Sequence, residues 1–242
     1  MCTVTYINSN SFRCLTSSRD EHRLRPAAVW PSSDFYSKKR LFYPKDPVGN
    51  GSWFVTSDSG TVSVLLNGAF KKHEINPSYQ KSRGAILVEL MKQEYMVDAF
   101  NGISLQNIEP FTVISYDRKI LYQFLWDGNE KYIKELDPSR NYIWASVTLY
   151  KEEIIQKRKN MFADFLVSNP FPDAPEICKF HLQNDGDTEN GLMITRQSGI
   201  LTQSITQAII CNSEIKMKYL DLLAKTVAEE SVKIVHLKQK IL

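Results

Sequence analysis

The sequence has few of the features that mark membrane, secreted or nucleic-acid-binding proteins. Its 242 residues contain no apolar run near the ~18 residues that a membrane helix needs. The start, MCTVTYINSNSF, carries neither a basic leader nor an apolar segment, so we expect no signal peptide. Lys and Arg number 30 against 27 Asp and Glu, a net charge of +3, which gives no basic surplus for a nucleic-acid partner. We therefore expect a cytoplasmic protein without a membrane span.

Cysteine is also scarce, and no two cysteines are spaced as CxxC. The four cysteines are Cys2, Cys14, Cys178 and Cys211. This spacing argues against a zinc site or a redox pair, so we expect free thiols and no metal. Residues 185–187, Asp-Gly-Asp, resemble the start of a calcium loop but lack its later ligands, and we interpret them as a turn.

What is present fits a soluble globular protein. Hydrophobic residues make up 43% of the chain and charged residues 24%, and we expect one domain over residues 1–242. Alternating or apolar runs bounded by turn residues predict strands over residues 2–7, 12–17, 53–56, 61–66, 111–116, 120–126, 142–149, 205–211 and 214–222. Residues 22–37, rich in Pro, Arg and Ser, are expected to form a loop.

Apolar residues recur with helical spacing in two longer segments. Residues 82–95 are predicted to form a helix with Ser82 as its N-cap, and residues 151–167 form the clearest helical pattern. A short helix is predicted over 176–182, and residues 229–242 fit either a helix or a strand. Strands at both ends with helices between them predict an α+β fold, with helices packed outside sheets.

Cys2 is the residue with the clearest chemical potential. Removal of the initiator Met, which is favoured by a small second residue, would leave a cysteine that bears a free α-amine. Such an amine has a pKa of roughly 7.7–8.0 and can accept a proton, while the ionised thiol is a strong nucleophile. One residue then supplies both nucleophile and base, as in N-terminal-nucleophile (Ntn) enzymes. The alternative is a small buried residue in a strand.

Two further segments supply groups that such a nucleophile needs. If residues 2–7 and 12–17 form a hairpin, Arg19 and Asp20 return close to Cys2. A carboxylate there can hold the ammonium or orient the thiol, and an arginine can lower the thiol pKa or bind an anionic group; a salt-bridged strand end is the alternative. Asn67, followed by Gly68, ends an apolar strand and can donate its amide to an oxyanion, although this segment taken singly favours a plain strand-to-turn exit.

Taken in order, these segments resemble the NRDE family, also called the transport and Golgi organisation 2 family, in its bacterial branch. The matching segments are Met-Cys-Thr at 1–3, Ser-Arg-Asp-Glu at 18–21, Gly-Ser-Trp at 51–53, Leu-Asn-Gly at 66–68, Ser-Arg-Gly at 82–84, Trp-Ala-Ser at 144–146 and Asn-Gly-Leu at 190–192. The resemblance covers nearly the whole chain.

The resemblance implies the four-layer αββα sandwich of Ntn hydrolases, near choloylglycine hydrolase and penicillin V acylase. It also implies that Cys2 is the nucleophile, Asp20 the orienting acid and Asn67 the oxyanion donor, with Arg19 in a less defined role. Two positions depart from the pattern: Ser18 replaces the Asn of the motif, and Ala145-Ser146 replaces a Ser-Asn pair. A serine hydroxyl at Ser146 has one donor where the amide has donor and acceptor groups.

Two functions follow from this resemblance. The first is a cysteine hydrolase that cleaves a linear, non-peptide C–N bond in a small-molecule amide and needs no cofactor. The second is a non-catalytic carrier on the same fold, with haem or a lipid-like molecule as cargo. The four histidines, His22, His73, His181 and His236, show no paired spacing. Each is expected to be a surface or core residue, although one axial ligand would suffice for haem. The oligomeric state and the substrate do not follow from the sequence.

Overall fold

The computed structural model describes residues 3–36, 39–74 and 79–235, so Cys2 lies outside the described residues. Within these described residues, thirteen strands form two antiparallel sheets. In spatial order, the six-stranded sheet A contains β10 (Tyr142–Ala145), β1 (Thr3–Asn8), β2 (Arg13–His22), β11 (Ile200–Ile210), β12 (Glu214–Asp221) and β13 (Thr226–Lys233). The seven-stranded sheet B contains β3 (Val29–Tyr36), β4 (Lys39–Lys45), β5 (Phe54–Ser57), β6 (Val62–Asn67), β7 (Phe111–Asp117), β8 (Ile120–Trp126) and β9 (Lys131–Leu136).

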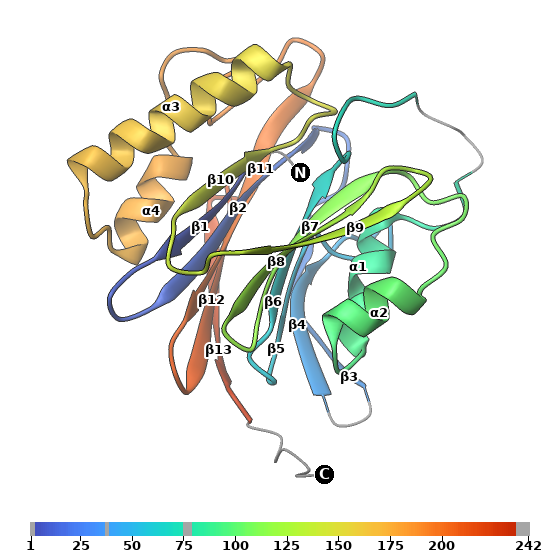
Figure 1. The fold of residues 1–242 in the computed structure, drawn as a ribbon. Helices are drawn as coiled ribbons and strands as arrows, with labels where there is room; N and C mark the ends of the chain where they lie inside the picture. The colour runs from blue at the N-terminus through green and yellow to red at the C-terminus, as the bar shows by residue number, and fades with distance from the viewer. Residues whose placement is uncertain (1–2, 37–38, 75–78, 236–242) are drawn as a thin grey trace.

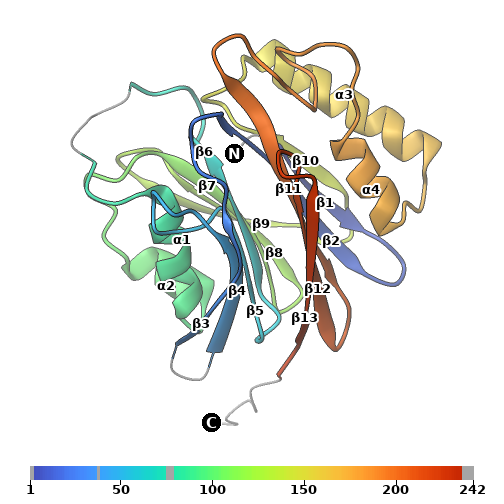
Figure 2. The same ribbon diagram turned by 180° about the vertical axis from the view of Figure 1, so that it is seen from behind.

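Helices cover the outer face of each sheet, which gives four layers (Figures 1 and 2). Helices α1 (Arg83–Lys92) and α2 (Met96–Gly102) lie on sheet B, and α3 (Glu152–Ser168) and α4 (Ala174–His181) lie on sheet A. The predicted α+β fold with an αββα order of layers is therefore confirmed.

Local sequence signals explain where the helices begin. The Ser82 hydroxyl accepts a hydrogen bond from the Ala85 backbone N–H at 3.1 Å, so the predicted N-cap of α1 is confirmed. At α4, Asp173 and Glu176 form a reciprocal capping box. These side chains satisfy backbone donors that the first helical turn leaves without partners.

A large apolar cluster fills the space between the two sheets. Val4, Tyr6 and Leu15 of sheet A pack there with Phe54 and Val64 of sheet B, all fully buried. Alternation along each strand sends every second side chain into this layer and the others toward the helices. The strand register thus decides which functional side chains lie between the sheets and which lie beneath the helices.

The structure corrects several sequence predictions, mostly at sheet edges. The predicted loop over residues 22–37 contains β3, which occupies one edge of sheet B and carries a register shift between Val29 and Ser32. Pro31, within that shift, is tolerated because an edge strand leaves some backbone positions unpaired. Strand β10 ends at Ala145 instead of extending to residue 149, and residues 226–233 form β13.

None of the helices in the described part of the chain combines the length and the apolar character needed to cross a bilayer.

Candidate active site

The start of β1 lies inside sheet A, between β10 and β2. Thr3, the first described residue, pairs with Ser18 of β2 and with Ala145 of β10. Its side chain is fully buried on the helix-facing side, where its hydroxyl accepts a hydrogen bond from the Arg158 guanidinium. The first described residue is therefore hydrogen-bonded into the middle of sheet A, between β10 and β2.

Arg19 projects from β2 into the layer between the sheets. Its guanidinium lies over the Trp53 ring, 4.4 Å from the ring centroid, and donates to the Gln203 amide oxygen. The Asp46 carboxylate is 3.6 Å away. Burial lowers the pKa of Arg19, but an arginine pKa starts so high that the side chain stays charged. The site thus contains a buried, fixed cation close to the strand that carries the N-terminus.

The position of Gln203 results from an irregularity in β11. The pairing of β11 with β2 shifts register between Thr202 and Ser204, so Gln203 is the extra residue of a bulge. Its side chain accepts from Arg19 and donates to the His22 carbonyl at 2.9 Å. Its backbone carbonyl accepts from the Leu222 N–H. The bulge turns an amide group toward Arg19, and nothing in the sequence indicated this.

Asp20 points to the opposite face of β2, toward the helices. The Tyr150 hydroxyl donates to one carboxylate oxygen at 2.9 Å, and the Thr202 hydroxyl donates to the other at 2.6 Å. The side chain is buried. Adjacent residues in a strand face opposite sides, so Arg19 and Asp20 flank the strand from its two faces.

Asn67 and Ser146 come together although they belong to different sheets. The Ser146 hydroxyl donates to the Asn67 backbone carbonyl at 2.8 Å and lies 2.9 Å from the Thr148 hydroxyl. Gly68 has a φ of 82°, and a Cβ there would come within 2.6 Å of Val147 and 2.8 Å of Thr148. The turn after β6 can approach the segment after β10 because residue 68 is glycine.

Asn67 and Ser146 differ in the hydrogen-bond donors that remain available to a ligand. Ser146 has one hydroxyl hydrogen, and it points to the Asn67 carbonyl. Among the described residues, none forms a hydrogen bond with the half-buried side-chain amide of Asn67. The Asn67 NH₂ can therefore donate to a ligand, whereas Ser146 holds the turn that carries Asn67.

Residues 1–216 match the family described as Transport and Golgi organisation 2. The chain belongs to this family. No curated protein sequence matches it. Solved structures that are similar in fold include two kinds of hydrolase. A Caenorhabditis elegans ortholog of N-acylethanolamine-hydrolyzing acid amidase shares 10% identity, with a TM-score of 0.59, over 85% of this chain and 92% of the other.

The second kind is conjugated bile acid hydrolase from Clostridium perfringens. One variant of that enzyme shares 8% identity, with a TM-score of 0.60, over 95% of this chain and 92% of the other. Another shares 9% identity, with a TM-score of 0.55, over 98% of both chains. At these identities the likeness establishes an Ntn-hydrolase fold for this member of the family, and it leaves the chemistry to be argued from the residues.

A buried polar layer beneath α3 and α4 adjoins Asp20, and the sequence analysis did not predict it. The His181 ring is fully buried; its Nε2 lies 2.8 Å from the Thr5 hydroxyl and its Nδ1 lies 2.8 Å from the Ser18 hydroxyl. Burial, and secondarily the charge of Arg158, lowers the pKa of His181 to about 3, so the ring is neutral. Both ring nitrogens are engaged, which makes His181 a core residue rather than a ligand.

The other histidines occupy unrelated positions. His73 lies 3.1 Å from Glu109, which also pairs with Arg83 at 3.0 Å. His22 ends β2, and His236 lies outside the described residues. In the described part of the chain no group of three or more His, Cys, Asp or Glu side chains is placed to hold a metal ion. Lys157 pairs with both Asp185 and Asp187, at 3.0 and 2.9 Å, in the segment interpreted as a turn.

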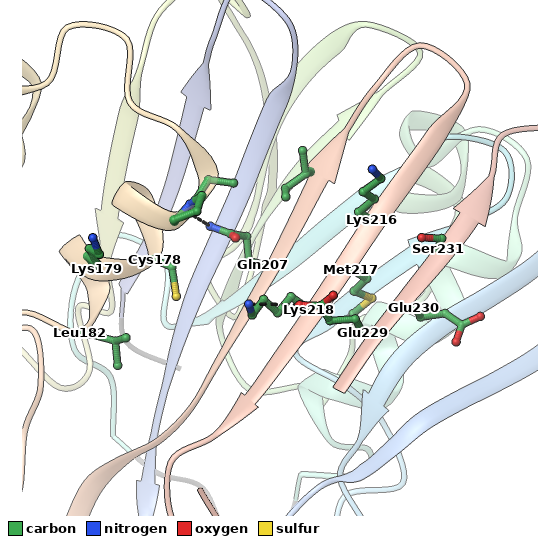
Figure 3. Close-up of a pocket in the computed structure, with 13 residues that line it drawn as sticks. Cys178, Lys179, Leu182, Gln207, Lys216, Met217, Lys218, Glu229, Glu230 and Ser231 are labelled. Atoms are coloured by element: carbon green, nitrogen blue, oxygen red, sulfur yellow. Dashed lines mark hydrogen bonds and ion pairs between the residues drawn. The ribbon is translucent and has the colours of Figure 1, made fainter. Parts of the chain in front are cut away.

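A shallow pocket of about 320 Å³ lies elsewhere, on the outer face of sheet A beside α4 (Figure 3). Cys178 of α4 and Leu182, the C-cap residue after it, line it together with Gln207, Met217 and Lys218 of the sheet. Lys218 pairs there with Glu229 at 3.1 Å. None of the predicted site residues contributes to its lining, so this pocket is separate from the candidate active site.

Proposed function

We propose that the protein is an Ntn-type cysteine hydrolase that cleaves a linear, non-peptide amide with Cys2 as its nucleophile. The observation that carries the proposal is the register of Thr3, paired with Ser18 on one side and Ala145 on the other. Consecutive Cα atoms are about 3.8 Å apart, so Cys2 is one residue from this position. The next residues along the two partner strands are Arg19 and Ser146, and Ser146 holds the turn that contains Asn67.

The reaction proposed for these groups has two halves. In the first, the Cys2 thiolate attacks the amide carbonyl and the Asn67 NH₂ donates to the developing oxyanion. The C–N bond then breaks, the amine leaves with a proton from the α-ammonium, and an acyl-thioester remains. In the second, the α-amine takes a proton from water, the hydroxide attacks the thioester, and the carboxylic acid leaves while Cys2 is restored.

Arg19 and Asp20 have positioning roles in this scheme. The buried Arg19 cation favours the thiolate over the thiol. Asp20, held by Tyr150 and Thr202, lies on the other face of β2 and stabilises the ammonium form that gives a proton to the leaving amine. The substrate is a small-molecule amide without a nucleic-acid component, and no cofactor takes part in the steps.

The proposal is tested first by thiol chemistry. Intact-mass measurement is expected to show loss of Met1, and iodoacetamide is expected to label Cys2 before the other thiols. Cys14 is fully buried with its pKa raised to about 12, and burial raises the pKa of Cys178 as well. Cys211 is the partly exposed competitor, so Cys211→Ser is the background variant. Retention of Met1, or labelling of Cys2 no faster than Cys211, would refute the proposal.

Acyl transfer is tested separately. Incubation of the Cys211→Ser protein with a p-nitrophenyl ester should place one acyl group on Cys2, seen by mass, and release p-nitrophenolate in a burst. Asn67→Asp is expected to slow this acylation by a factor of about 100 to 1,000, the usual effect of removing one oxyanion donor. Equal acylation in Cys2→Ala would show that another residue reacts.

A non-catalytic carrier of haem or a lipid-like molecule is the second candidate. The observation that favours it is Ser146, whose single donor points to the Asn67 carbonyl instead of toward a ligand. Titration with haem is expected to give a saturable Soret shift that Cys2→Ala or His73→Ala removes. His73 is the histidine tested because both ring nitrogens of His181 already form hydrogen bonds. Absence of saturable binding would dismiss haem as cargo and leave the hydrolase proposal intact.

A further inference from the structure

The inner face of sheet A changes from apolar to polar along β11 and its partner β2. Ala208 of β11 belongs to the apolar cluster between the sheets. Two residues before it, Thr206 pairs with Ser17, and a further two residues before that, Ser204 pairs with Arg19. Directly paired residues share one face of a sheet, and all four of these side chains are buried. These four residues are called the polar end of the layer between the sheets.

Aromatic rings adjoin this polar end. The Arg19 guanidinium lies over the Trp53 ring, 4.4 Å from its centroid. Thr206 pairs on its other side with Tyr219 of β12, and the Tyr219 ring stacks on Trp30 of β3 with centroids 5.8 Å apart. Trp53 and Tyr219 are buried, and Trp30 is partly buried against the same cluster. Groups from both sheets therefore combine polar hydrogen and apolar surface in one place.

Several of these groups are buried without a hydrogen bond. The indole Nε1 of Trp53, the indole Nε1 of Trp30 and the Thr206 hydroxyl have no partner among the described residues. Trp53 is only 3% exposed and Thr206 is fully buried. Folded proteins leave few such groups unpaired, because each loses its bonds to water and gains nothing in return. An indole N–H can only donate, so the group that would pair with Trp53 is an acceptor.

The charges beside the polar end indicate that this acceptor is neutral. The Asp46 carboxylate lies 2.7 Å from Arg25 and 3.6 Å from Arg19, and the Glu21 carboxylate lies 3.7 Å and 3.9 Å from the same two guanidinium groups. Two cations thus face two anions, which leaves no excess charge to attract a carboxylate or an ammonium ion. The side chains of Arg25 and Glu21 are 31% and 32% exposed, so this end of the layer reaches solvent.

We propose that the polar end binds the carbonyl group of a neutral, largely apolar ligand, with the Trp53 indole N–H and the Thr206 hydroxyl as its donors. The rings of Trp30, Trp53 and Tyr219 supply apolar contacts for the remainder of the ligand. The inference goes beyond the proposed function. It rests on described residues and needs no reaction at Cys2, so it applies equally to a hydrolase and to a carrier.

The test follows the indole N–H signals of the ¹⁵N-labelled protein by NMR during titration with cyclohexanone. This ketone offers a neutral carbonyl and has no bond that hydrolysis could break, and the Cys2→Ala background prevents addition of that thiol. The sequence has four tryptophans, and Trp→Phe substitutions assign their signals. Trp126 is the internal control, because its N–H already donates to the Ile108 carbonyl at 2.9 Å.

We expect the Trp53 signal to move in a saturable way while the Trp126 signal stays in place. Cyclohexane, compared at equal concentration, should not move the Trp53 signal, because it has no acceptor. Cyclohexanecarboxylate should bind at least about tenfold more weakly than the ketone. An unmoved Trp53 signal, or equal movement with cyclohexane, would overturn the inference and mean that water alone serves these donors. Carboxylate binding as tight as ketone binding would refute the neutral class of ligand.

A matched pair of variants tests the donor itself. Trp53→Phe keeps an aromatic ring but loses the N–H, and we expect it to weaken cyclohexanone binding by a factor of about 3 to 10, the effect of one hydrogen bond, measured on the Thr206 backbone amide signal. Trp126→Phe makes the same change at a donor that is already paired and should leave the affinity unchanged. Equal affinities in wild type and Trp53→Phe would contradict the inference.

Thr206→Val provides a second route if Trp53→Phe does not fold. It keeps the shape of the side chain and removes the hydroxyl, so the same weakening is expected and unchanged affinity is again the contrary result. The outcome is distinguishable from that of the proposed function. Slow alkylation of Cys2 would refute the hydrolase and leave the ketone titration unaffected, whereas an unmoved Trp53 signal would refute this inference alone.

Discussion

The two helix-covered faces of the molecule are built differently. Beneath α1 and α2, sheet B contributes a continuous apolar cluster in which Leu87, Phe100 and Phe124 are fully buried. Beneath α3 and α4, a smaller apolar cluster that includes Ile7, Phe162 and Phe180 lies beside buried polar side chains. The buried polar residues of this face include Thr3, Thr5, Ser18, Asp20, Arg158, His181 and Gln207. The same layer order thus has one helix-covered face packed by hydrophobic contact and one that combines hydrophobic contact with buried hydrogen bonds.

This difference indicates which face of the fold carries buried polar groups that add little stability and that a reaction can use. Buried polar groups stabilise a protein little when they are paired and destabilise it strongly when a partner is lost. They are concentrated on the face that surrounds the start of β1, where Thr3 contacts Arg158. The layer between the sheets and the helix-covered face of sheet B contain most of the buried apolar contacts, and the helix-covered face of sheet A contains the polar side chains around Thr3.

The largest effect on stability should come from the apolar face. Phe100→Ala removes a fully buried ring that contacts Phe111 and Phe124, and we expect the free energy of unfolding to fall by about 3–5 kcal/mol. Urea denaturation measures this loss. In molecules that remain folded, the alkylation rate of Cys2 should stay within a factor of two. A large drop in that rate would show that the two faces are coupled.

The pH dependence of stability should come mainly from the polar face. His181 has a pKa of about 3 when folded and about 6.5 when unfolded. Between these values the unfolded chain binds a proton that the folded chain does not, so the free energy of unfolding falls as pH falls from 6.5 toward 3. The slope approaches about 1.4 kcal/mol per pH unit.

His181→Gln tests this slope, since its amide can still bond Thr5 and Ser18 but cannot titrate. Urea midpoints between pH 7 and 4 are expected to vary less in the variant than in the wild type. His73→Gln is the matched control, because His73 is the half-buried partner of Glu109, and both residues lie outside the two sheets. Parallel pH curves for wild type and His181→Gln would contradict the prediction.

A smaller loss is expected at Thr202, which donates to the Asp20 carboxylate at 2.6 Å. Thr202→Val keeps the shape but removes both the donor to Asp20 and the acceptor of the Ile194 backbone N–H, which lies at 3.0 Å, so unfolding becomes easier by about 1–3 kcal/mol. Thr56→Val is the control: its hydroxyl donates only to the neutral Phe42 carbonyl and the Met217 sulfur. Thermal denaturation should show the greater loss for Thr202→Val, and the reverse order would refute the contrast.

The sequence predicted the fold where the hydrophobic pattern was regular. The pairs β5–β6, β7–β8 and β11–β12, together with α1 and α3, follow from apolar periodicity and turn residues. Strands β3, β4 and β9 were missed because edge or charged strands carry little alternation: β9 reads KYIKEL and is mostly exposed. Helix α2, seven residues without a side-chain cap, gives too weak a signal.

Site residues divide in the same way. Arg19, Asp20, Asn67 and Ser146 lie at strand ends that a hairpin or a family motif can point to, and their catalytic roles remain predictions. Tyr150, Arg158 and Gln203 could not be found in this way. The helix approach that brings Arg158 to Thr3 and the bulge that turns Gln203 toward Arg19 depend on tertiary packing. The only local sign was polar residues inside buried strands.

The smallest expected effect on stability lies on the exposed side of α3, which covers sheet A. Lys157, one residue before Arg158, pairs with Asp185 and Asp187 at 3.0 and 2.9 Å but is 37% exposed. Solvent screens such pairs, so Lys157→Met should change the free energy of unfolding by well under about 1 kcal/mol, and less at high salt. Arg158→Met, at the fully buried neighbouring position, should lower the free energy of unfolding several times more. Urea denaturation of both variants at low and high salt makes the comparison. Equal losses of unfolding free energy in the two variants would mean that burial does not distinguish the two cations. Arg158 would then behave like an ordinary surface charge.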